Sequence, residues 1–479
     1  MIRLILWNFV FALAARVLQI AVSFALLMVI ARYLPVEDFG AYSYIGAFTA
    51  AVMALSYFGV QNILTRDIAQ KTFDTSTLYS TATALRGIMA LLAASLLAAL
   101  WMIGENGSIP LWIVLLAAAS EAMLGYTLLQ KSVLQGIERM GYMPVLTFIQ
   151  SVSIGILAVG VIYAKGGYEW FFAAALLSNA AQFIAGGGIL RRNGVRVDFS
   201  LVRKDHLKTF FAHSMMVGFA VILYKNLFVV NTLALKWLGN LESLAYFQAV
   251  HGLVIQSQIL PMALSMAVFP AVSRLINKDF GAAAKILSES VKIMFFISAG
   301  AAAILWAFAG EVTQLVYGDK YAPSAYAMAV LAWALPALWM DLPLSGALVA
   351  MNRQKFSVMC AAVVLAANAA LAFAFIPAYG FHAASWLALA SYTLMPVCAV
   401  AFLMKQGVRF SFMSWAPQAG IPAAVCIMAA LWLKPHIGLA ASAVGGLVYV
   451  AGLFMTRGVS ISEIKNLRRA LAMPGKDER

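Results

Sequence analysis

Residues 32–42 read Arg-Tyr-Leu-Pro-Val-Glu-Asp-Phe-Gly-Ala-Tyr, and residues 236–246 read Lys-Trp-Leu-Gly-Asn-Leu-Glu-Ser-Leu-Ala-Tyr. Both stretches begin with a base, an aromatic residue and leucine, and both continue to an acid and then Ala-Tyr, at a constant offset of 204 residues. A similar match joins residues 138–142 to residues 352–356 at an offset of 214. One such match can arise by chance in an alanine-rich chain, but two at similar offsets predict an internal repeat.

The stretches of this repeat lie between apolar runs that are long enough to cross a bilayer. A transmembrane helix needs about 20 apolar residues. Apolar residues make up 63% of the 479 positions and charged residues 11%, against roughly 45–50% and 25% in soluble proteins. So few charges cannot form a water-soluble surface, and the sequence predicts an all-α polytopic membrane protein with about 14 transmembrane helices. The spans are expected at 5–31, 40–60, 79–102, 111–130, 143–164, 170–190, 211–235, 244–269, 289–309, 324–348, 356–377, 381–404, 412–433 and 436–456.

The repeat and the spans together predict the domain organisation. Six spans in each repeat keep both repeats in the same orientation, so the expected arrangement is two six-helix bundles related by a pseudo-two-fold axis normal to the membrane. Such bundles enclose a central cleft in which alternating access can operate by rocking one half against the other. The predicted parts are an N-terminal bundle, a C-terminal bundle, two additional transmembrane helices and a cytoplasmic basic tail, at 1–200, 201–406, 407–460 and 461–479.

The placement of basic residues predicts the orientation. Connectors of the set that contains both termini hold 24 Lys and Arg residues, whereas the alternate connectors hold five. Because basic residues concentrate on the cytoplasmic side, both termini are expected in the cytoplasm and the protein in a bacterial inner membrane. This bias accounts for most of the net charge of +14, so no nucleic-acid partner is expected.

The connectors also argue against an enzyme. None exceeds about 20 residues, which leaves no room for a soluble catalytic domain, and the sequence has no phosphate-binding GxxxxGK[ST] loop. The five histidines and three cysteines show no metal-ligand spacing. We therefore expect no catalytic residues, no metal and no cofactor.

Ionisable residues inside the spans are the strongest indication of a functional site. A charge at the bilayer centre costs roughly 2.5–3.5 kcal/mol on insertion scales, so such residues normally face a bundle interior or water. The repeat arranges six of them in pairs on the first, third and fourth helices of each half: Arg16 with Lys225, Arg86 with Lys292, and Glu121 with Asp341.

Each in-span charge also has a structural interpretation. Arg16 and Lys225 lie near mid-span and are expected to face the cavity, although an ion pair between Arg16 and Glu121 is an alternative. Arg86 and Lys292 lie within two turns of the cytoplasmic end. They form either a cationic ring on the side where a substrate enters or long side chains that snorkel to the headgroups.

Acids and uncharged polar side chains extend this pattern. Glu121 and Asp341 are either partners in structural ion pairs or sites that couple transport to a H⁺ or Na⁺ gradient. Polar residues follow one helix face in three spans, and they either line a lumen or form interhelical hydrogen bonds. The polar residues of these faces are Gln19 and Ser23, then Asn179 and Gln182, and then Gln248, His251 and Gln258.

The chemistry of these groups favours an anionic, hydroxyl-rich passenger. Guanidinium and ammonium groups facing one lumen attract phosphate, and the polar faces offer hydrogen bonds to a sugar. A cationic cleft of this kind suits a lipid-linked glycan better than a cationic drug.

Several segments carry a resemblance to a known family. The stretch from Ala31 to Tyr42, continued by Gly59 and the sequence Thr-Arg-Asp-Ile-Ala at 65–69, resembles the amino-terminal signature of Wzx-type polysaccharide flippases. These flippases form the polysaccharide transporter family of the MOP exporter superfamily. Similar segments lie at 245–261, at 268–274, and at 376–380 followed by two alanines at 383–384, so the resemblance covers roughly residues 1–405.

This resemblance implies two six-helix bundles, often with two further helices, and a cycle between inward- and outward-facing states. It also implies a polyprenyl diphosphate substrate carrying an oligosaccharide repeat unit, moved from the cytoplasmic to the periplasmic leaflet. The chain departs from the family at Lys225-Asn226, near which these proteins often carry an acid. A carboxylate coupling site in the seventh span is therefore in doubt.

The sequence thus predicts a flippase for an undecaprenyl-diphosphate-linked glycan. Arg16 and Lys225 are expected to contact either the diphosphate or an acidic sugar. The expected partners are the lipid-linked glycan, membrane lipids, and a glycan polymerase with its export machinery. Three alternatives stay open: a MATE-like drug/cation antiporter, a lipid II flippase of the same fold, and a membrane-embedded glycan polymerase or ligase. The last normally needs a sizeable periplasmic loop, which this chain lacks.

Overall fold

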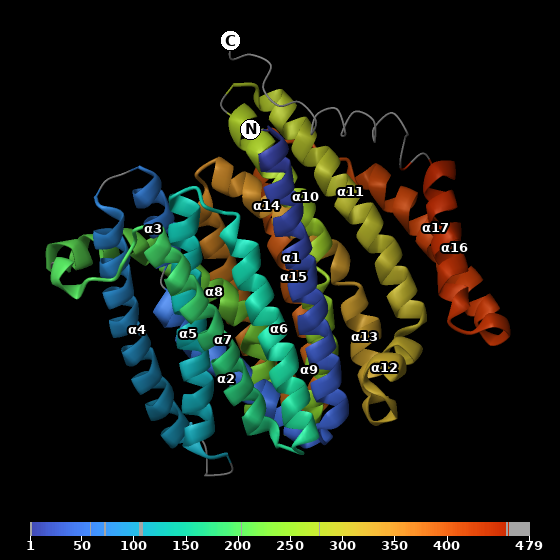
Figure 1. The fold of residues 1–479 in the computed structure, drawn as a ribbon. Coiled ribbons are helices and arrows are strands. Elements are labelled where there is room, and N and C mark those ends of the chain that lie inside the picture. The colour runs from blue at the N-terminus through green and yellow to red at the C-terminus, as the bar shows by residue number, and fades with distance from the viewer. Residues whose placement is uncertain are drawn as a thin grey trace. The chain divides into compact units, whose positions relative to one another are not determined.

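A computed structural model shows a chain of helices joined by short connectors (Figure 1). The structure describes residues 2–57, 59–70, 73–104, 109–202, 204–276, 278–456 and 458, and for residues 2–16, among others, it describes the backbone only. No strand occurs in these ranges. Contacts divide the chain into two compact units, Met1–Ala245 (unit 1) and Tyr246–Arg479 (unit 2), and each is described by itself.

Unit 1 is a bundle of apolar helices. Its core consists mainly of aliphatic side chains from α3, α4 and α5, packed together with residues of α6, α7 and α8. Within it α7 lies between α5 and α6, and α1 packs along α6. The elements of this unit are α1 (Ile2–Tyr33), α2 (Val36–Tyr57), α3 (Val60–Ala69), α4 (Thr75–Gly104), α5 (Leu111–Gly136), α6 (Tyr142–Tyr163), α7 (Tyr168–Arg192), the 3₁₀ helix η1 (Phe199–Leu201) and α8 (Lys204–Leu238).

The boundary of unit 1 differs from the one predicted at residue 200. The repeat places α8 at the start of the second bundle, whereas its contacts group it with α2. Gly40 lies against the segment that directly follows α8, where a Cβ would come within 2.2 Å of the carbonyl oxygen of Leu241. The indole Nε1 of Trp237 also donates to the hydroxyl of Tyr44 at 3.2 Å. A sequence repeat reflects common ancestry of two segments, whereas contacts reflect how the helices pack. The repeat boundary at residue 200 and the contact boundary at Ala245 therefore need not coincide.

Unit 2 contains shorter and more interrupted helices. They are α9 (Leu241–Gln256, which begins in unit 1), α10 (Ile259–Leu275), α11 (Phe280–Ala307), α12 (Ala309–Tyr317), the 3₁₀ helix η2 (Asp319–Tyr321), α13 (Ser324–Ala332), α14 (Leu335–Ala350), α15 (Gln354–Lys405), α16 (Phe412–Ile437) and α17 (Ala440–Met455).

Two of the interruptions have a common cause. Proline removes a backbone hydrogen bond and its ring clashes with the carbonyl four residues earlier. The break between α9 and α10 lies at Ser257, four residues before Pro261, and α13 ends at Ala332, four residues before Pro336. The pair α13–α14 bends by 46°. The predicted spans 244–269 and 324–348 are therefore each made of two helices.

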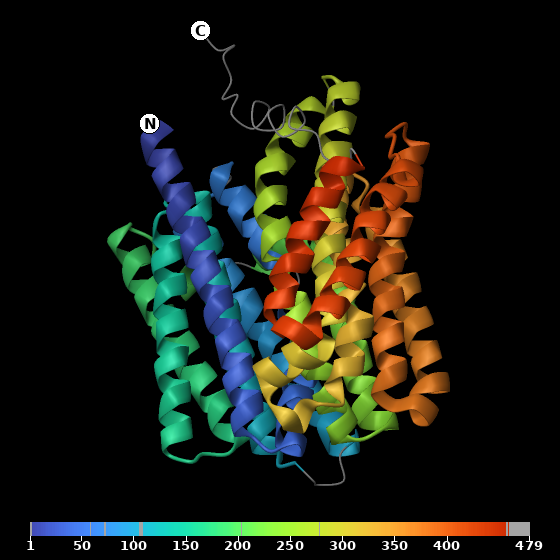
Figure 2. The same cartoon turned by 90° about the vertical axis from the view of Figure 1, so that its right-hand side faces the viewer.

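The helix α15 divides at Gly380, where φ is +53° and ψ is −133°. This left-handed φ favours glycine because other residues meet a Cβ clash. The amide of Asn368 in the first half donates to the carbonyl oxygen of Leu387 and to the hydroxyl of Ser391 in the second half. The two halves thus run side by side as a hairpin (Figure 2), and they match the separate spans predicted at 356–377 and 381–404.

The two helices α16 and α17 pack against each other and against α11 (Figure 2). The ring of Tyr449 lies over Gly300, and its hydroxyl donates to the carbonyl oxygen of Phe296 at 2.6 Å. An ion pair of 2.6 Å joins Lys434 of α16 to Glu311 of α12. These helices occupy the predicted segment 407–460, whereas the predicted basic tail at 461–479 lies outside the described residues.

These elements confirm the predicted fold class. Each predicted span coincides with a helix, a broken helix pair or one half of α15. Within the described ranges, eight helices are long and apolar enough to cross a membrane on their own. The chain is an all-α polytopic membrane protein.

Candidate functional site

Four side chains from four helices of unit 1 meet in a charged cluster. We define the cluster as Tyr57 at the end of α2, Arg86 in the middle of α4, Glu121 in α5 and Lys225 in α8. The helices themselves are apolar, so three ionisable groups inside them need a local reason for their position.

The ring of Tyr57 holds two like charges together. The guanidinium carbon Cζ of Arg86 lies 4.2 Å from the ring centroid, and the ammonium Nζ of Lys225 lies 4.0 Å from it. A cation near an aromatic face gains about 0.5–2 kcal/mol, with the upper value in desolvated sites. Tyr57 therefore offsets part of the repulsion between the two cations.

Glu121 supplies the negative charge of the cluster. Its carboxylate oxygen Oε2 accepts a hydrogen bond from the hydroxyl of Tyr57 at 2.9 Å. The same Oε2 lies 4.0 Å from Nζ of Lys225. One carboxylate oxygen thus faces both the hydroxyl and the ammonium group, and the cluster as a whole carries a formal charge of +1.

Arg86 is fully buried and is short of partners. Its side chain is 0% exposed, and none of its three guanidinium nitrogens has a hydrogen-bond partner among the described residues. The guanidinium lies against Gly125 of α5, where a Cβ would come within 1.7 Å of Nη2. Buried polar groups are nearly always hydrogen-bonded, and an unpaired buried charge is costly. The neighbours that accommodate this cation are the ring of Tyr57 and the surface of α5 at Gly125.

The cluster has an accessible layer and a buried layer. The side chains of Lys225 and Glu121 are 37% and 26% exposed, whereas Arg86, which also lies against the Tyr57 ring, is buried. An approaching ligand can contact Lys225 and Glu121 directly, and the buried charge of Arg86 acts on it only at longer range. The chemical capacity of this arrangement is attraction of an anion, since two cations face one acid.

The structure assigns different surroundings to the predicted cavity cations. It brings Arg86 and Lys225 together, while Lys292 lies in unit 2 with its Nζ 5.6 Å from the ring centroid of Phe296. The side chain of Arg16 lies outside the described residues. The snorkelling alternative for Arg86 is wrong, because a side chain that is 0% exposed reaches no headgroup. The partner of Glu121 in the described part of the chain is Lys225.

The amides of α7 are interior packing groups. The Nδ2 of Asn179 donates to the backbone carbonyl and to the hydroxyl of Ser120 at 3.2 and 3.1 Å. The Nε2 of Gln182 donates to the carbonyl oxygen of Leu146 at 2.8 Å. Both side chains are buried. They join α7 to α5 and α6, as the interhelical alternative expects, while Oδ1 of Asn179 and Oε1 of Gln182 have no hydrogen-bond partner in the described part of the chain.

The other predicted polar residues are spread over both units. Buried His251 shares a hydrogen bond of 2.5 Å between its Nε2 and the hydroxyl of Tyr392, which ties α9 to α15. Of the remaining residues, Ser23 is exposed and the other three are half-buried: Gln19, Gln248 and Gln258.

Asp341 lies in α14, where it is half-buried and accepts a hydrogen bond from the hydroxyl of Ser345 one turn later, at 3.3 Å.

In the described part of the chain, no group of three His, Cys, Asp or Glu side chains is placed to hold a metal ion.

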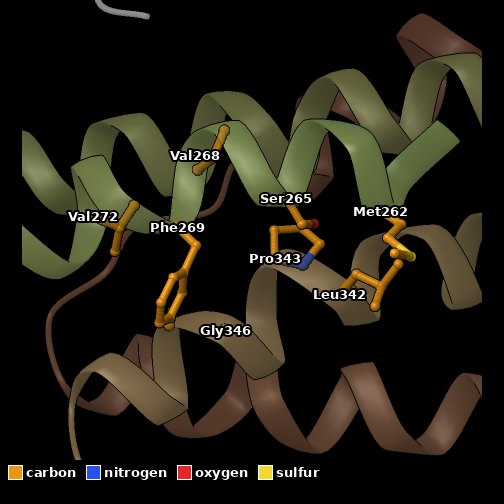
Figure 3. A pocket seen from close by; sticks show the side chains of 9 residues that line it. Met262, Ser265, Val268, Phe269, Val272, Leu342, Pro343 and Gly346 are labelled. Carbon is orange, nitrogen blue, oxygen red and sulfur yellow. The ribbon is translucent and has the colours of Figure 1, made fainter. Parts of the chain in front are cut away.

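Unit 2 contains an apolar cavity of about 240 Å³ between α10 and α14 (Figure 3). Phe269 and Val272 of α10 face Pro343 and Gly346 of α14 across it, and Ser265 is the polar side chain in its wall. No charged group lines it, so its chemistry differs from that of the charged cluster.

Sequence reasoning missed Tyr57 and Gly125. Tyr57 is one of 17 tyrosines and Gly125 one of 34 glycines, and neither shows a motif of its own. The sequence does contain an indirect indication of such residues. Arg86 and Glu121 lie inside spans, and a charge inside a span requires neighbouring residues that accommodate it.

Comparisons with known proteins give a family and a fold. The family model described as polysaccharide biosynthesis protein matches residues 5–276, and the MatE model matches residues 217–374. No curated protein matches the chain by sequence. Among solved structures, the lipid II flippase MurJ in an inward closed conformation is similar with a TM-score of 0.76 and 12% identity, over 96% of this chain and 100% of that chain.

Two further structures have the same fold. An inward-facing multidrug resistance MATE family transporter of the MOP superfamily gives a TM-score of 0.65 at 14% identity, over 81% of this chain and 94% of that one. A MOP superfamily transporter from Pyrococcus furiosus gives 0.56 at 14% identity, over 86% and 96%. At such identities the likeness establishes the fold.

Proposed function

Because the chain belongs to the polysaccharide biosynthesis protein family and has the fold of MOP-superfamily flippases and transporters, we propose that it flips a polyprenyl-diphosphate-linked oligosaccharide. The proposed direction is from the cytoplasmic to the periplasmic leaflet of the bacterial inner membrane, with both termini in the cytoplasm. The proposed cycle is alternating access. The carrier lipid is proposed to be undecaprenyl diphosphate.

The charged cluster carries this proposal. Arg86 and Lys225 place two cations against one aromatic ring, and Arg86 has no hydrogen-bond partner among the described residues. A diphosphate offers the multiple anionic oxygens that guanidinium and ammonium groups bind best. We assign Lys225 to direct contact with the phosphate. We assign Arg86 to long-range electrostatic attraction from its buried position beside Tyr57.

The driving force is also part of the proposal. An inside-negative potential favours outward movement of negative charge by about 2.3 kcal/mol per elementary charge per 100 mV. Glu121 and Asp341 are the in-span acids that could add coupling to a H⁺ or Na⁺ gradient. A glycan polymerase and export machinery would receive the translocated glycan.

Two rival functions share this fold. A lipid II flippase would use the same attraction for a diphosphate, and the MurJ structure covers nearly the whole chain. A drug/cation antiporter would need a site with net negative charge, whereas the charged cluster has two cations and one acid. The cluster therefore favours an anionic lipid-linked glycan over a cationic drug.

The test is complementation of bacterial strains blocked in glycan flipping. One strain lacks its O-antigen or capsule flippase, and a second is depleted of its lipid II flippase. We expect the wild-type chain to restore surface glycan in the first strain, and Lys225→Ala and Arg86→Ala to reduce it at least about tenfold. Lys434→Ala is the matched control, because it removes a cation in the last turn of α16 in unit 2 that is paired with Glu311.

The outcomes separate the alternatives. Rescue confined to the second strain would replace the proposed function by lipid II flipping. Export of ethidium without rescue of either strain would indicate the antiporter. Full export by both cluster variants, at wild-type protein levels, would remove the site assignment.

A further inference from the structure

Glu121 occupies the place in the charged cluster where an anion would bind. Its Oε2 accepts from the hydroxyl of Tyr57 at 2.9 Å and faces Nζ of Lys225 at 4.0 Å. A hydroxyl donor and an ammonium group directed at a single oxygen form a small anion site, and the carboxylate of the chain fills it. The position of Oε2 therefore marks where one oxygen of an incoming anion would lie.

The contact between this carboxylate and the ammonium group is loose. Charge-assisted hydrogen bonds between ammonium and carboxylate groups are usually about 2.7–2.9 Å long, whereas this separation is 4.0 Å. Glu121 thus neutralises Lys225 partly and leaves its hydrogen-bonding capacity largely available. An anion that comes closer and carries more charge would bind Lys225 more strongly than Glu121 does.

Exchange at this position needs little rearrangement. Lys225 and Glu121 are the exposed members of the charged cluster. Arg86 can stay in place against Gly125 and still add its attraction from its buried position beside the Tyr57 ring. A new anion would need to displace the carboxylate from one hydroxyl and one ammonium group, and the displaced carboxylate is free to turn to solvent.

We propose that Glu121 is the resident counter-ion of the charged cluster, and that a phosphate oxygen of the substrate takes the place of its Oε2 between Tyr57 and Lys225. This inference rests on the proposed function and adds a specificity-determining residue to it. A diphosphate carries more charge than the carboxylate and displaces it. A neutral or singly charged sugar does not. When the Glu121 carboxylate returns, it competes with the phosphate for Tyr57 and Lys225 and so assists release of the substrate.

The test measures binding of inorganic pyrophosphate to the full-length protein in nanodiscs by isothermal titration calorimetry. Glu121→Gln keeps an acceptor for the Tyr57 hydroxyl and removes the competing charge, so we expect pyrophosphate to bind about tenfold tighter than to the wild type. Glu311→Gln is the matched control, because it removes an acid that an ion pair of 2.6 Å joins to Lys434 in unit 2. Its affinity should equal that of the wild type.

The remaining outcomes distinguish this inference from the proposed function. If Glu121→Gln binds pyrophosphate no more tightly than the wild type does, the counter-ion role of Glu121 is overturned. If Lys225→Ala at the same time loses pyrophosphate binding, the assignment of Lys225 to the phosphate site stands. Binding absent from the wild type and from Glu121→Gln alike would overturn both. Tighter binding by Glu311→Gln would show a nonspecific effect of net charge and would also overturn the counter-ion role.

Discussion

Gly125 of α5 and Arg86 of α4 fit together so closely that a Cβ on the glycine would come within 1.7 Å of Nη2 of the guanidinium. A helical glycine normally costs about 1 kcal/mol relative to alanine. At this position the glycine leaves space for the planar guanidinium of Arg86 between α4 and α5, and this contact offsets the cost. The glycine therefore belongs to the charged cluster although it carries no chemistry of its own.

We predict that Gly125→Ala impairs transport as much as Arg86→Ala does. The added methyl group must push the guanidinium from the Tyr57 ring or separate the helices, and overpacking of this kind costs about 1–3 kcal/mol. Surface glycan in the complemented strain measures the effect, normalised to protein level. Gly155→Ala is the control, because a Cβ at Gly155 meets nothing within 4 Å. Wild-type transport by Gly125→Ala would show that the position of Arg86 is unimportant.

Two substitutions at Tyr57 separate its ring from its hydroxyl. Tyr57→Phe keeps the aromatic face between the two cations and removes the hydrogen bond to Glu121. Tyr57→Leu removes both. Loss of one hydrogen bond to a charged group is worth about 1.5–3 kcal/mol at most, so we expect Tyr57→Phe to retain partial transport and partial pyrophosphate affinity. Tyr57→Leu should lose transport and lower the yield of folded protein, since Arg86 and Lys225 then repel each other without the ring. Equal activity of the two variants would contradict the role of the aromatic face.

The fold could be predicted from the sequence because its determinants are local. Length and apolarity fix each span, and the prolines at 261 and 336 act on the helix turn directly before them. Gly380 lies in the gap that separates the predicted spans 356–377 and 381–404. The grouping of α8 with α2 cannot be predicted in this way, because it depends on contacts between residues far apart in the sequence, such as Trp237 and Tyr44, which leave no pattern along the chain.

The site could be predicted in part. Arg86, Glu121 and Lys225 stand out because a charge inside an apolar span is costly wherever it lies. Which charges meet depends on how the helices rotate and cross, and the repeat does not encode that. It places Lys225 and Arg16 at equivalent positions in the two halves, and equivalence does not reveal that Lys225 contacts Glu121. Amides such as Asn179 look the same in sequence whether they bind a solute or a neighbouring helix.

Asn179 provides a test of the packing role. Its side chain donates to both the carbonyl and the hydroxyl of Ser120, and polar contacts between membrane helices are worth about 0.6 kcal/mol on average and 1.7 at most. We expect Asn179→Ala to lower the melting temperature measured by intrinsic fluorescence in detergent, while transport per folded molecule stays within about twofold of the wild type. Ser120→Ala removes one of the two acceptors and should cause a smaller shift. A large loss of transport without loss of stability would return Asn179 to the group of substrate-binding residues.

Docking of α17 on α11 depends on one tyrosine and one glycine. The hydroxyl of Tyr449 donates to the carbonyl oxygen of Phe296 at 2.6 Å, and its ring fills the space above Gly300, where a Cβ would come within 2.4 Å of the ring. Tyr449→Phe removes the hydrogen bond alone and should cost about 0.6 kcal/mol. Gly300→Leu displaces the whole ring and should cost several times as much. We expect the second variant to expose the segment between α15 and α16 to limited proteolysis, because α16 is held against α11 together with α17. Gly310→Leu is the control, since a Cβ at Gly310 meets nothing within 4 Å. If Gly300→Leu were as stable and as protease-resistant as Gly310→Leu, the contact between Tyr449 and Gly300 would not be what holds the terminal helices.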